Sequence, residues 1–170
     1  MKGNSIRIRQ ASPNDYSLII GVLDLWWGGR PMTDMLPRLF LTHFCETSFI
    51  AELDSEIIGF LIGFLSQSYS EEAYIHFVGI HPDYRKKGIG SALYRQFFET
   101  AQAYGRLRVK CVTAPVNKSS IAYHLRMGFV TEPSETQEDG VPYHVDYDGE
   151  GEHRVLFVKH LSVTSDAQKA

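Results

Sequence analysis

The sequence predicts an α/β fold in which helices flank both faces of a mixed β-sheet. The stretch 73–80 is rich in β-branched and aromatic residues, which is typical of a strand. A basic glycine loop follows, then a helical apolar period over 88–104 and a second strand-like stretch at 107–113. A strand–helix–strand run of this length implies a parallel pair with a right-handed crossover. Upstream, strand-like stretches at 48–53 and 56–65 lie on either side of a short turn, so the sheet combines both strand directions.

The start of the chain predicts a strand followed by a helix. Ile6 and Ile8 alternate with arginines, which is typical of a half-buried strand. Ser12 and Pro13 favour a helix start, with Ser12 as the N-cap and Pro13 as the first helical residue. Helical spacing of apolar residues continues until 26–31, where glycines and a proline break the helix.

Two more helices and two more strands follow from the same kinds of signal. Thr33 or Asp34 is placed to cap a second helix that carries the apolar residues of 36–44. A later helix opens at 115–117 and closes at Gly128, a natural C-terminal glycine. Short strands are expected at 129–130 and 155–158.

Length and composition indicate one globular domain. A chain of 170 residues with a hydrophobic share of 44% can bury a substantial core, and we expect a domain over 1–161 with a polar tail over 162–170. A net charge of -3 gives no electrostatic case for nucleic acid or for an anionic membrane. Cys45 and Cys111 lack metal-ligand spacing, so we expect buried free thiols, no metal and a reducing cytosol.

The opening of the chain and its apolar stretches favour a cytoplasmic protein without membrane spans. No signal peptide is recognisable at the start of the sequence. The longest apolar stretch, 18–27, is too short to span a bilayer and contains Asp24.

A basic glycine loop joins the central strand to the next helix and has the properties of an anion-binding site. Its residues are Arg85, Lys86, Lys87, Gly88, Ile89 and Gly90. Backbone N–H groups at a helix N-terminus have no partner within the helix, and the helix dipole adds partial positive charge there. Glycines allow a phosphate to approach the backbone closely. Gly79 lies inside the preceding strand, where a glycine often marks a bulge or a close ligand approach.

The spacing within the loop narrows the kind of phosphate ligand. A Walker loop is absent, and Leu93 occupies the place of the third glycine of a dinucleotide fingerprint. The pattern Arg85-x-x-Gly88-x-Gly90 instead resembles the pyrophosphate-binding motif of the GNAT superfamily of acyl-CoA-dependent N-acyltransferases. The strand end Val78-Gly79-Ile80-x-Pro82, the amphipathic helix and the later Asn117 and Gly128-Phe129 extend the resemblance over roughly residues 5 to 160.

The resemblance implies a single-domain GNAT fold, with a mixed and partly splayed sheet of about seven strands flanked by about four helices. It also implies an enzyme that moves an acetyl group from acetyl-CoA directly to a primary amine, without a covalent enzyme intermediate. The residues that it assigns to the coenzyme are Val78, Gly79, Ile80, Arg85, Lys86, Lys87, Gly88, Ile89, Gly90 and Asn117. In this assignment the strand end donates N–H groups to the thioester carbonyl and the pantetheine arm.

The amine acceptor must lose a proton before it attacks, because an alkyl ammonium has a pKa of about 10.4. His76 is the preferred base, since serotonin N-acetyltransferases look similar in this stretch and carry a catalytic histidine at the matching place. The alternative is a hydrogen-bonded core histidine. Many family members have an acid where this chain has Tyr74, a residue that we expect to face the acceptor. Glu71 and Glu72, acting through water, and His81, on the opposite face, are weaker candidates.

The departing thiolate needs a proton, and the family's frequent general acid is a tyrosine four residues before the Gly-Phe pair. Here that place holds His124, and Tyr123 is one residue earlier. One residue turns a helix by about 100°, so the two side chains cannot reach the same sulfur in the same way. We favour His124 by register and keep Tyr123 as a close second by chemistry, with a core aromatic as the alternative role of Tyr123. Asn117 matches the family residue that contacts CoA and is also a natural N-cap.

The acceptor side carries weaker signals. The loop between the first two helices often shapes the acceptor pocket in this family, and here it begins with Trp26 and Trp27. Either one indole lines that pocket or both belong to the core. The segment 130–152 holds eight acidic residues and no Lys or Arg, which is typical of a solvated loop and hairpin. A more specific interpretation is that these carboxylates form an acidic rim that attracts a cationic amine acceptor, with Tyr143 and Tyr147 covering it.

Two functions of different classes stay open at this point. The first is an N-acetyltransferase that transfers the acetyl group directly to the amine. No strong nucleophile is evident, because Cys111 lies in an apolar strand, which argues against an activated thiolate. The second is a CoA-binding sensor or regulatory module without turnover, since the order of Tyr123 and His124 departs from the family pattern. The acceptor is either a small-molecule amine or a protein amine, and the resemblance makes a homodimer an expectation.

Overall fold

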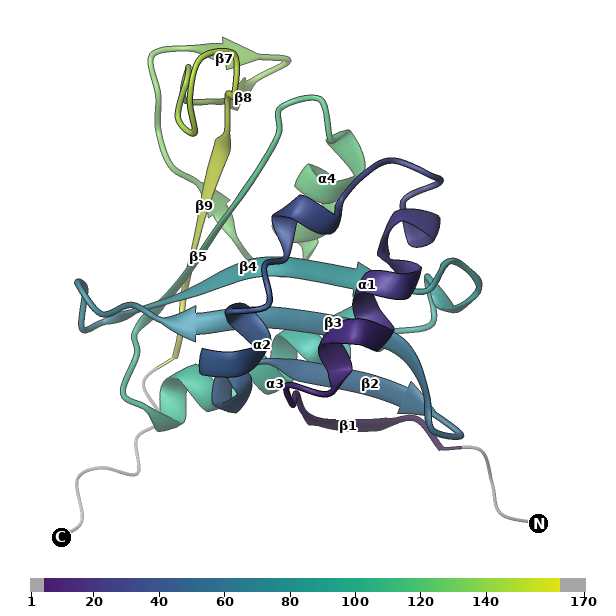
Figure 1. Ribbon diagram of the computed structural model, residues 1–170. Coiled ribbons are helices and arrows are strands. Elements are labelled where there is room, and N and C mark those ends of the chain that lie inside the picture. The colour runs from purple at the N-terminus through teal and green to yellow at the C-terminus, as the bar shows by residue number, and fades with distance from the viewer. Residues whose placement is uncertain (1–4, 163–170) are drawn as a thin grey trace, which may run out of the picture. The chain divides into compact units, whose positions relative to one another are not determined.

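The computed structural model describes residues 5–162, which form nine strands and four α-helices (Figure 1). The strands are β1 (Arg7–Gln10), β2 (Phe49–Leu53), β3 (Glu56–Leu65), β4 (Glu72–Ile80), β5 (Arg108–Thr113), β6 (Val130–Thr131), β7 (Gln137–Glu138), β8 (Val141–Pro142) and β9 (Val155–His160). The α-helices are α1 (Asp15–Trp26), α2 (Phe40–His43), α3 (Ile89–Ala103) and α4 (Lys118–Arg126). Short 3-10 helices cover Thr33–Met35, Cys45–Thr47 and Pro82–Tyr84.

Hydrogen bonds order seven of these strands as β1-β2-β3-β4-β5-β9-β6, and β7 and β8 form a separate hairpin. β4 and β5 run parallel, with Glu72 opposite Arg108 and Tyr74 opposite Lys110. The β1–β2, β2–β3, β5–β9 and β6–β9 pairs are antiparallel. The sheet is therefore mixed, and the parallel pair expected from the strand–helix–strand run is confirmed. The splay expected along β4 stays a prediction.

The described residues divide into two compact units. The first comprises 5–65 and 75–104, and the second comprises 66–74 and 105–162. β4 contributes its first residues to the second unit and its remaining residues to the first. The expected polar tail lies outside the described residues from 163 onward.

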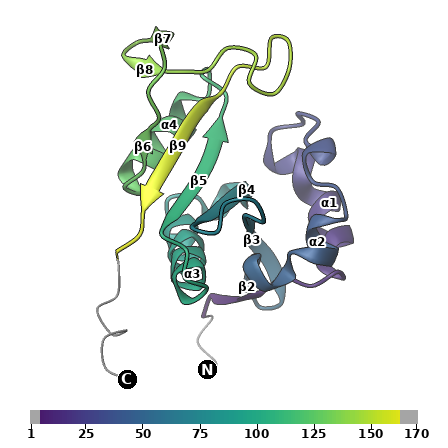
Figure 2. The same ribbon diagram turned by 90° about the vertical axis from the view of Figure 1, so that its left-hand side faces the viewer.

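The first unit covers its strands with helices on both faces. α1 and α2 lie on one face of β2, β3 and β4, and α3 lies on the other (Figure 2). α1 buries Ile19, Leu23 and Trp26 at helical spacing, against Phe60 and Ile62 of β3. α3 buries the apolar stripe Ile89, Leu93, Phe97 and Ala101.

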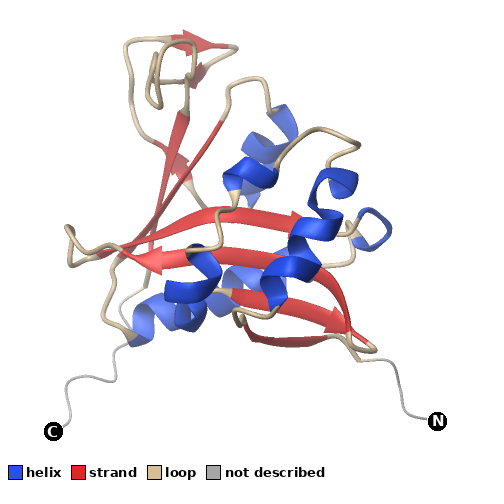
Figure 3. Cartoon of the chain, viewed as in Figure 1, coloured by secondary structure: helices blue, strands red, loops and turns tan. Residues whose placement is uncertain are grey.

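The continuous helix predicted over 36–44 is wrong in its extent. This part of the chain forms only the single turn of α2, flanked by two 3-10 helices (Figure 3). Pro37 is the reason, because a proline disfavours helical backbone in the residue before it. Leu36 accordingly has φ -129° and ψ 71°. Neither Thr33 nor Asp34 is an N-cap.

The start of α1 also differs from the prediction. Asn14 is its N-cap, so neither Ser12 nor Pro13 has the predicted position. The N–H and the hydroxyl of Ser12 both donate to the Asp15 carboxylate, at 2.7 and 3.1 Å. The carboxylate of Asp15, the first helical residue, thus accepts two hydrogen bonds from the turn that precedes the helix.

The turn between β2 and β3 is confirmed at the predicted residues. Asp54 and Ser55 both have left-handed backbone, with φ 50° and 69°. Leu53 and Glu56 pair directly on either side of them. Two-residue hairpin turns with positive φ at both central residues match the twist of the flanking strands.

The second unit has a smaller core built from β5, β9 and α4. Alternate residues of the two strands are buried, with Val109 and Cys111 in β5 and Val155 and Phe157 in β9. α4 adds Ile121 and His124 to this core. The β7–β8 hairpin and the turns around it complete the unit.

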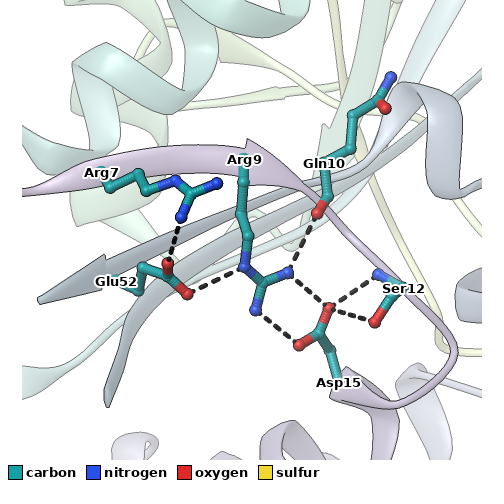
Figure 4. A network of polar contacts seen from close by, with 6 residues as sticks. All are labelled: Arg7, Arg9, Gln10, Ser12, Asp15 and Glu52. Atoms are coloured by element: carbon teal, nitrogen blue, oxygen red, sulfur yellow. Dashed lines mark hydrogen bonds and ion pairs between the residues drawn. The ribbon is translucent and has the colours of Figure 1, made fainter. Parts of the chain in front are cut away.

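A network of ion pairs ties β1 to β2 and to the start of α1 (Figure 4). Arg9 donates to both oxygens of the Asp15 carboxylate, at 2.9 and 2.8 Å, and to Glu52 at 2.9 Å. The Asp15 side chain is only 4% exposed. Burial by itself would raise the pKa of Asp15, but hydrogen bonds from Arg9 and Ser12 bring it below its ordinary value.

Replacing Asp15 tests this network. Asp15→Asn should lower the free energy of unfolding at pH 7 by about 2–4 kcal/mol, because Arg9 loses one of its two carboxylate partners in a partly buried place. The folded pKa of Asp15 is depressed, so its stabilisation is present above the ordinary pKa of 3.8 and is lost as pH falls through the folded value. Urea unfolding of wild type and variant should therefore show a gap that narrows below that pH.

The exposed Glu56 provides the control for this measurement. Glu56→Gln should change stability by less than about 0.5 kcal/mol. Equal losses in the two variants, or a gap that persists at low pH, would contradict the role given to the Arg9–Asp15 pair.

Candidate functional site

β4 leads through the 3-10 helix Pro82–Tyr84 into the basic loop and α3. Lys86 and Gly88 have left-handed backbone, with φ 62° and 81°, so the loop reverses direction within a few residues. A glycine adopts this conformation without steric strain. Gly88 is the N-cap of α3, and no side chain caps this helix. The predicted order of strand, glycine loop and helix is confirmed.

The loop offers both amide donors and positive charge. The first N–H groups of a helix have no acceptor within it, and the 15 residues of α3 add the positive end of a helix dipole. Arg85, Lys86 and Lys87 are exposed just before this end. An anion such as a phosphate finds hydrogen-bond donors and favourable charge in such a place.

Gly79 has a packing reason that no sequence pattern signals. A Cβ atom at this position would lie 2.5 Å from the Phe60 ring and 2.9 Å from the Trp27 indole. These distances leave no room for any side chain. The absence of a side chain therefore allows β3, β4 and the end of α1 to pack closely, and a role of Gly79 toward a ligand stays a prediction.

The two tryptophans at the end of α1 pack against this same region. Trp26 is 3% exposed and stacks on Phe60, with ring centroids 6.0 Å apart. Trp27 stacks on Phe77 of β4 at 5.1 Å and is half-buried. Of the two interpretations left open, core packing describes Trp26, whereas Trp27 keeps an exposed part that can contact a ligand.

His76 is held from two sides within the first unit. Its Nε2 lies 2.6 Å from the carbonyl oxygen of Met35, and its ring stacks on Phe40 at 4.1 Å with an angle of 7°. A carbonyl oxygen only accepts, so Nε2 carries the hydrogen and Nδ1 has the lone pair. Burial lowers the pKa of His76, while the Met35 contact acts in the opposite sense, so the imidazole is mainly neutral at pH 7. A neutral imidazole with a lone pair can act as a base.

The weaker candidates for the base have other partners. The carboxylates of Glu71 and Glu72 lie 3.2 and 3.5 Å from the Arg108 guanidinium. His81 accepts a hydrogen bond from the Asp83 N–H at Nδ1, and its ring packs edge-on against Trp26. These contacts favour structural roles for all three residues.

Tyr74 lies in the second unit beside a small cavity of about 40 Å³. Lys110, Cys111 and Tyr147 line the same cavity. Burial raises the pKa of the Tyr74 phenol well above its ordinary value. The phenol therefore keeps its proton at neutral pH, and Tyr74 can bind or donate but cannot serve as an ionised base.

His124 is buried in the core of the second unit. Its ring stacks on Phe157 at 4.9 Å, and Nδ1 lies 2.8 Å from the carbonyl oxygen of Ser120. Nδ1 therefore carries the hydrogen of the neutral ring. Burial lowers the pKa of His124, with the Ser120 contact acting in the opposite sense. Tyr123 is half-buried, with the Arg126 guanidinium 5.8 Å from its ring centre.

Asn117 caps α4 as the sequence predicted. Its Oδ1 accepts a hydrogen bond from the Ser120 N–H at 3.2 Å. The Ser119 hydroxyl donates to the same oxygen. Asn117 is exposed at the start of the helix, and its contact with a coenzyme stays a prediction.

Cations from outside the acidic segment 130–152 balance much of its charge. Lys110 lies 2.7 Å from Glu132, and Lys118 and Arg154 approach four further carboxylates of the segment. These four belong to Glu138, Asp139, Asp148 and Glu152. Such pairing is typical of a solvated hairpin and weakens the interpretation as a rim that attracts amines.

Both cysteines are free thiols. Cys111 is buried in β5, and burial raises its pKa far above the ordinary value. Cys45 is half-buried, donates to the Leu41 carbonyl at 3.0 Å, and also has a raised pKa because of burial and the nearby Asp15 charge. Neither thiol has the ionisation that a nucleophile needs at neutral pH.

Comparison with known proteins identifies the family. Residues 19–129 match the profile of the Acetyltransferase (GNAT) family. This match covers more than half of the chain, and the chain belongs to that family. The matched region contains β4, the basic loop, α3 and α4. The predicted resemblance is confirmed.

Individual relatives agree with this assignment. L-2,4-diaminobutyric acid acetyltransferase of Nocardia farcinica is 29% identical over 84 residues, which are 49% of this chain and 44% of that protein. The diaminobutyrate acetyltransferase of Paenibacillus lautus, solved with L-2,4-diaminobutyric acid and coenzyme A, has a TM-score of 0.66 at 20% identity, over 96% of this chain and 99% of that one. The ribosomal-protein-S18-alanine N-acetyltransferase of Escherichia coli has a TM-score of 0.67 at 15% identity, over 98% and 100%.

The solved structures confirm the predicted GNAT fold class. The chain spans less than half the length of the curated relatives that it matches. Within residues 5–162, no group of three or more His, Cys, Asp or Glu side chains could hold a metal ion. In the same part of the chain, no helix combines the length and the apolar character that crossing a membrane requires.

The close contact at Gly79 predicts a specific loss of stability. Gly79→Ala should lower the free energy of unfolding by about 1–3 kcal/mol, because the new methyl group overlaps the Phe60 ring. Gly21→Ala in α1 is the matched control, since nothing lies within 4 Å of a Cβ atom there. That variant should gain about 0.5–1 kcal/mol from the better helix propensity of alanine. Thermal unfolding of both variants measures the difference, and a stable Gly79→Ala protein would show that the contact is not tight.

Proposed function

We propose that this protein transfers an acetyl group from acetyl-CoA to a primary amine, directly and without a covalent enzyme intermediate. The observation that carries the proposal is the N-terminus of α3, which no side chain caps, behind a left-handed Gly88 and three exposed cations, in a member of the GNAT family. The relative solved with coenzyme A and an amine supports the choice of both substrates.

In this proposal the basic loop holds the pyrophosphate of the coenzyme. The amides of Gly88, Ile89 and Gly90 donate to it, and exposed cations of the loop add charge. The strand end Val78–Ile80 precedes this loop, with only the turn of the 3-10 helix Pro82–Tyr84 between them, and it pairs with the thioester arm. Asn117 contacts the coenzyme from the start of α4.

His76 acts as the general base. Its neutral ring presents Nδ1 as an acceptor, and this nitrogen takes the proton of the ammonium group directly or through water. The neutral amine then attacks the thioester carbonyl, so that a C–N bond forms and the C–S bond breaks, and the nitrogen releases its second proton to solvent to leave the amide. The sulfur leaves with the electron pair of that bond and needs a proton.

Tyr123 supplies that proton. The neutral His124 ring already directs its one N–H toward the Ser120 carbonyl, and burial disfavours a second proton on it. His124 could donate only by giving up that hydrogen bond, which makes it the alternative acid despite its favourable register.

The acceptor class is a small-molecule primary amine. One relative is named for diaminobutyric acid, and another is named for the alanine of a ribosomal protein, so a protein amine is the alternative. The exposed part of Trp27 and the protonated Tyr74 phenol are the acceptor contacts that we favour. Two free thiols fit a reducing compartment, and we place the protein in the cytoplasm.

Coenzyme binding is the first test. Calorimetry should detect acetyl-CoA and CoA with dissociation constants in the range of about 1 μM to 1 mM. Acetyl-pantetheine, which lacks the pyrophosphate, should bind at least about 100-fold more weakly, because it cannot use the loop. Equal affinity for the two thioesters would contradict a phosphate site at α3.

Release of free thiol with a panel of amines then separates catalysis from binding alone. An enzyme consumes acetyl-CoA in the presence of at least one amine. Binding without consumption across the panel would favour the alternative, a CoA-binding module without turnover.

Substitutions of the catalytic residues form the second test. His76→Gln should lower kcat/KM by about 100-fold or more, and Tyr123→Phe should lower kcat by about ten- to 100-fold. In the wild type, kcat/KM should rise with pH through a midpoint below 6.5, because the pKa of His76 is lowered and its neutral form is the active one. His76→Gln should lose this step.

His43 and His124 provide the comparisons. His43 is exposed at the end of α2, and His43→Gln should leave kcat/KM unchanged. His124→Phe keeps an aromatic ring against Phe157 and should retain most of the activity. Loss of activity in a folded His124→Phe protein, with Tyr123→Phe active, would reverse the assignment of the acid.

A further inference from the structure

Arg85 directs its guanidinium to main-chain carbonyl groups of the first unit. Nη2 donates to the carbonyl of Trp26 at 2.5 Å, and Nε donates to the carbonyl of Ile80 at 3.3 Å. Trp26 is the last residue of α1, and Ile80 is the last residue of β4. One side chain of the basic loop therefore joins the ends of a helix and a strand.

The carbonyl of Trp26 lies at the C-terminal end of α1, where it needs a hydrogen-bond donor from outside the helix. The last carbonyls of a helix have no donor within it, and the helix dipole places partial negative charge at this end. α1 has no basic residue in its last turn. Arg85, which follows Trp26 by 59 residues in sequence, supplies the missing cation with a charged hydrogen bond.

Ring contacts hold both sides of the same junction. His81 packs edge-on against Trp26 at 5.5 Å and against Tyr84 at 5.4 Å. The Lys87 ammonium lies 4.9 Å above the Tyr84 ring. The residues before and after Arg85 are thus packed in place, which directs its guanidinium toward α1.

We propose that Arg85 is a positioning residue that clamps the end of α1 to the basic loop, and that it does not contact the phosphate of the coenzyme. The inference rests on the proposed function, because it leaves the phosphate to the loop amides, Lys86 and Lys87. It replaces the role of phosphate ligand that the sequence predicted for Arg85.

Two properties separate a clamp from a phosphate ligand. Without any ligand, losing a clamp loosens the fold at the end of α1. With the coenzyme, losing a clamp weakens binding with only a small change in its dependence on salt, because the guanidinium faces the Trp26 carbonyl and makes no contact with the phosphate. Losing a phosphate ligand leaves the ligand-free fold unchanged and makes coenzyme binding clearly less dependent on salt.

The first experiment uses the ligand-free protein with Arg85→Gln, Arg85→Lys and the control Lys86→Gln, which removes the same charge one residue later. Arg85→Gln should lower the melting temperature by roughly 4–8 °C, and Lys86→Gln should change it by roughly 1 °C or less. Arg85→Lys should recover less than half of the loss, because one ammonium cannot reproduce the fork of a guanidinium. Trp26 and Trp27 are the chain's two tryptophans, so a red shift of emission in Arg85→Gln alone locates the change at the end of α1.

The second experiment titrates acetyl-CoA at increasing NaCl concentrations. Arg85→Gln should weaken binding roughly three- to tenfold with a smaller change in salt dependence than Lys86→Gln, which should make that dependence clearly shallower. Unchanged melting and emission in Arg85→Gln, together with a salt dependence as shallow as that of Lys86→Gln, would overturn the inference. If the wild type binds no acetyl-CoA, the proposed function fails, and a selective melting loss in Arg85→Gln still supports the clamp.

Discussion

The end of α1 lies so close to β3 and β4 at Gly79 that no side chain fits between them, and the candidate site of the first unit depends on this contact. Phe60 and Trp27 occupy the space that a Cβ atom would need. Trp26 stacks on the same Phe60 ring, so the helix end cannot shift without disturbing both contacts. β4 continues from Gly79 into the basic loop within a few residues. The packing therefore fixes where the loop begins.

Two buried imidazoles show how the backbone can give one side-chain type two chemistries. A carbonyl oxygen holds Nε2–H of His76, whereas another carbonyl holds Nδ1–H of His124. Each ring is neutral, and each leaves a different nitrogen as the acceptor. Phe40 and Phe157 stack on the respective rings and keep them from turning. The main-chain carbonyl beside a histidine therefore sets which ring nitrogen can accept a proton, and the position of the residue in the sequence does not reveal this.

Features set by neighbouring residues could be predicted from the sequence, whereas those set by distant partners could not. The turn at Asp54-Ser55 and the cap at Asn117 follow from local backbone chemistry, and both are present. Pro37 was a local signal too, and it shortens the helix expected over 36–44. The stacking of Phe40 on His76 joins residues 36 positions apart, for which a single sequence contains no pattern. The partner of Arg85 was missed for the same reason.

The ionisation of the two thiols also bears on how the protein ages. Oxidants attack the thiolate form of cysteine, and the first product is a sulfenic acid. Burial keeps Cys111 protonated, and Cys45 is held near the Leu41 carbonyl with a raised pKa. We therefore expect both sulfur atoms to react slowly with peroxide at neutral pH.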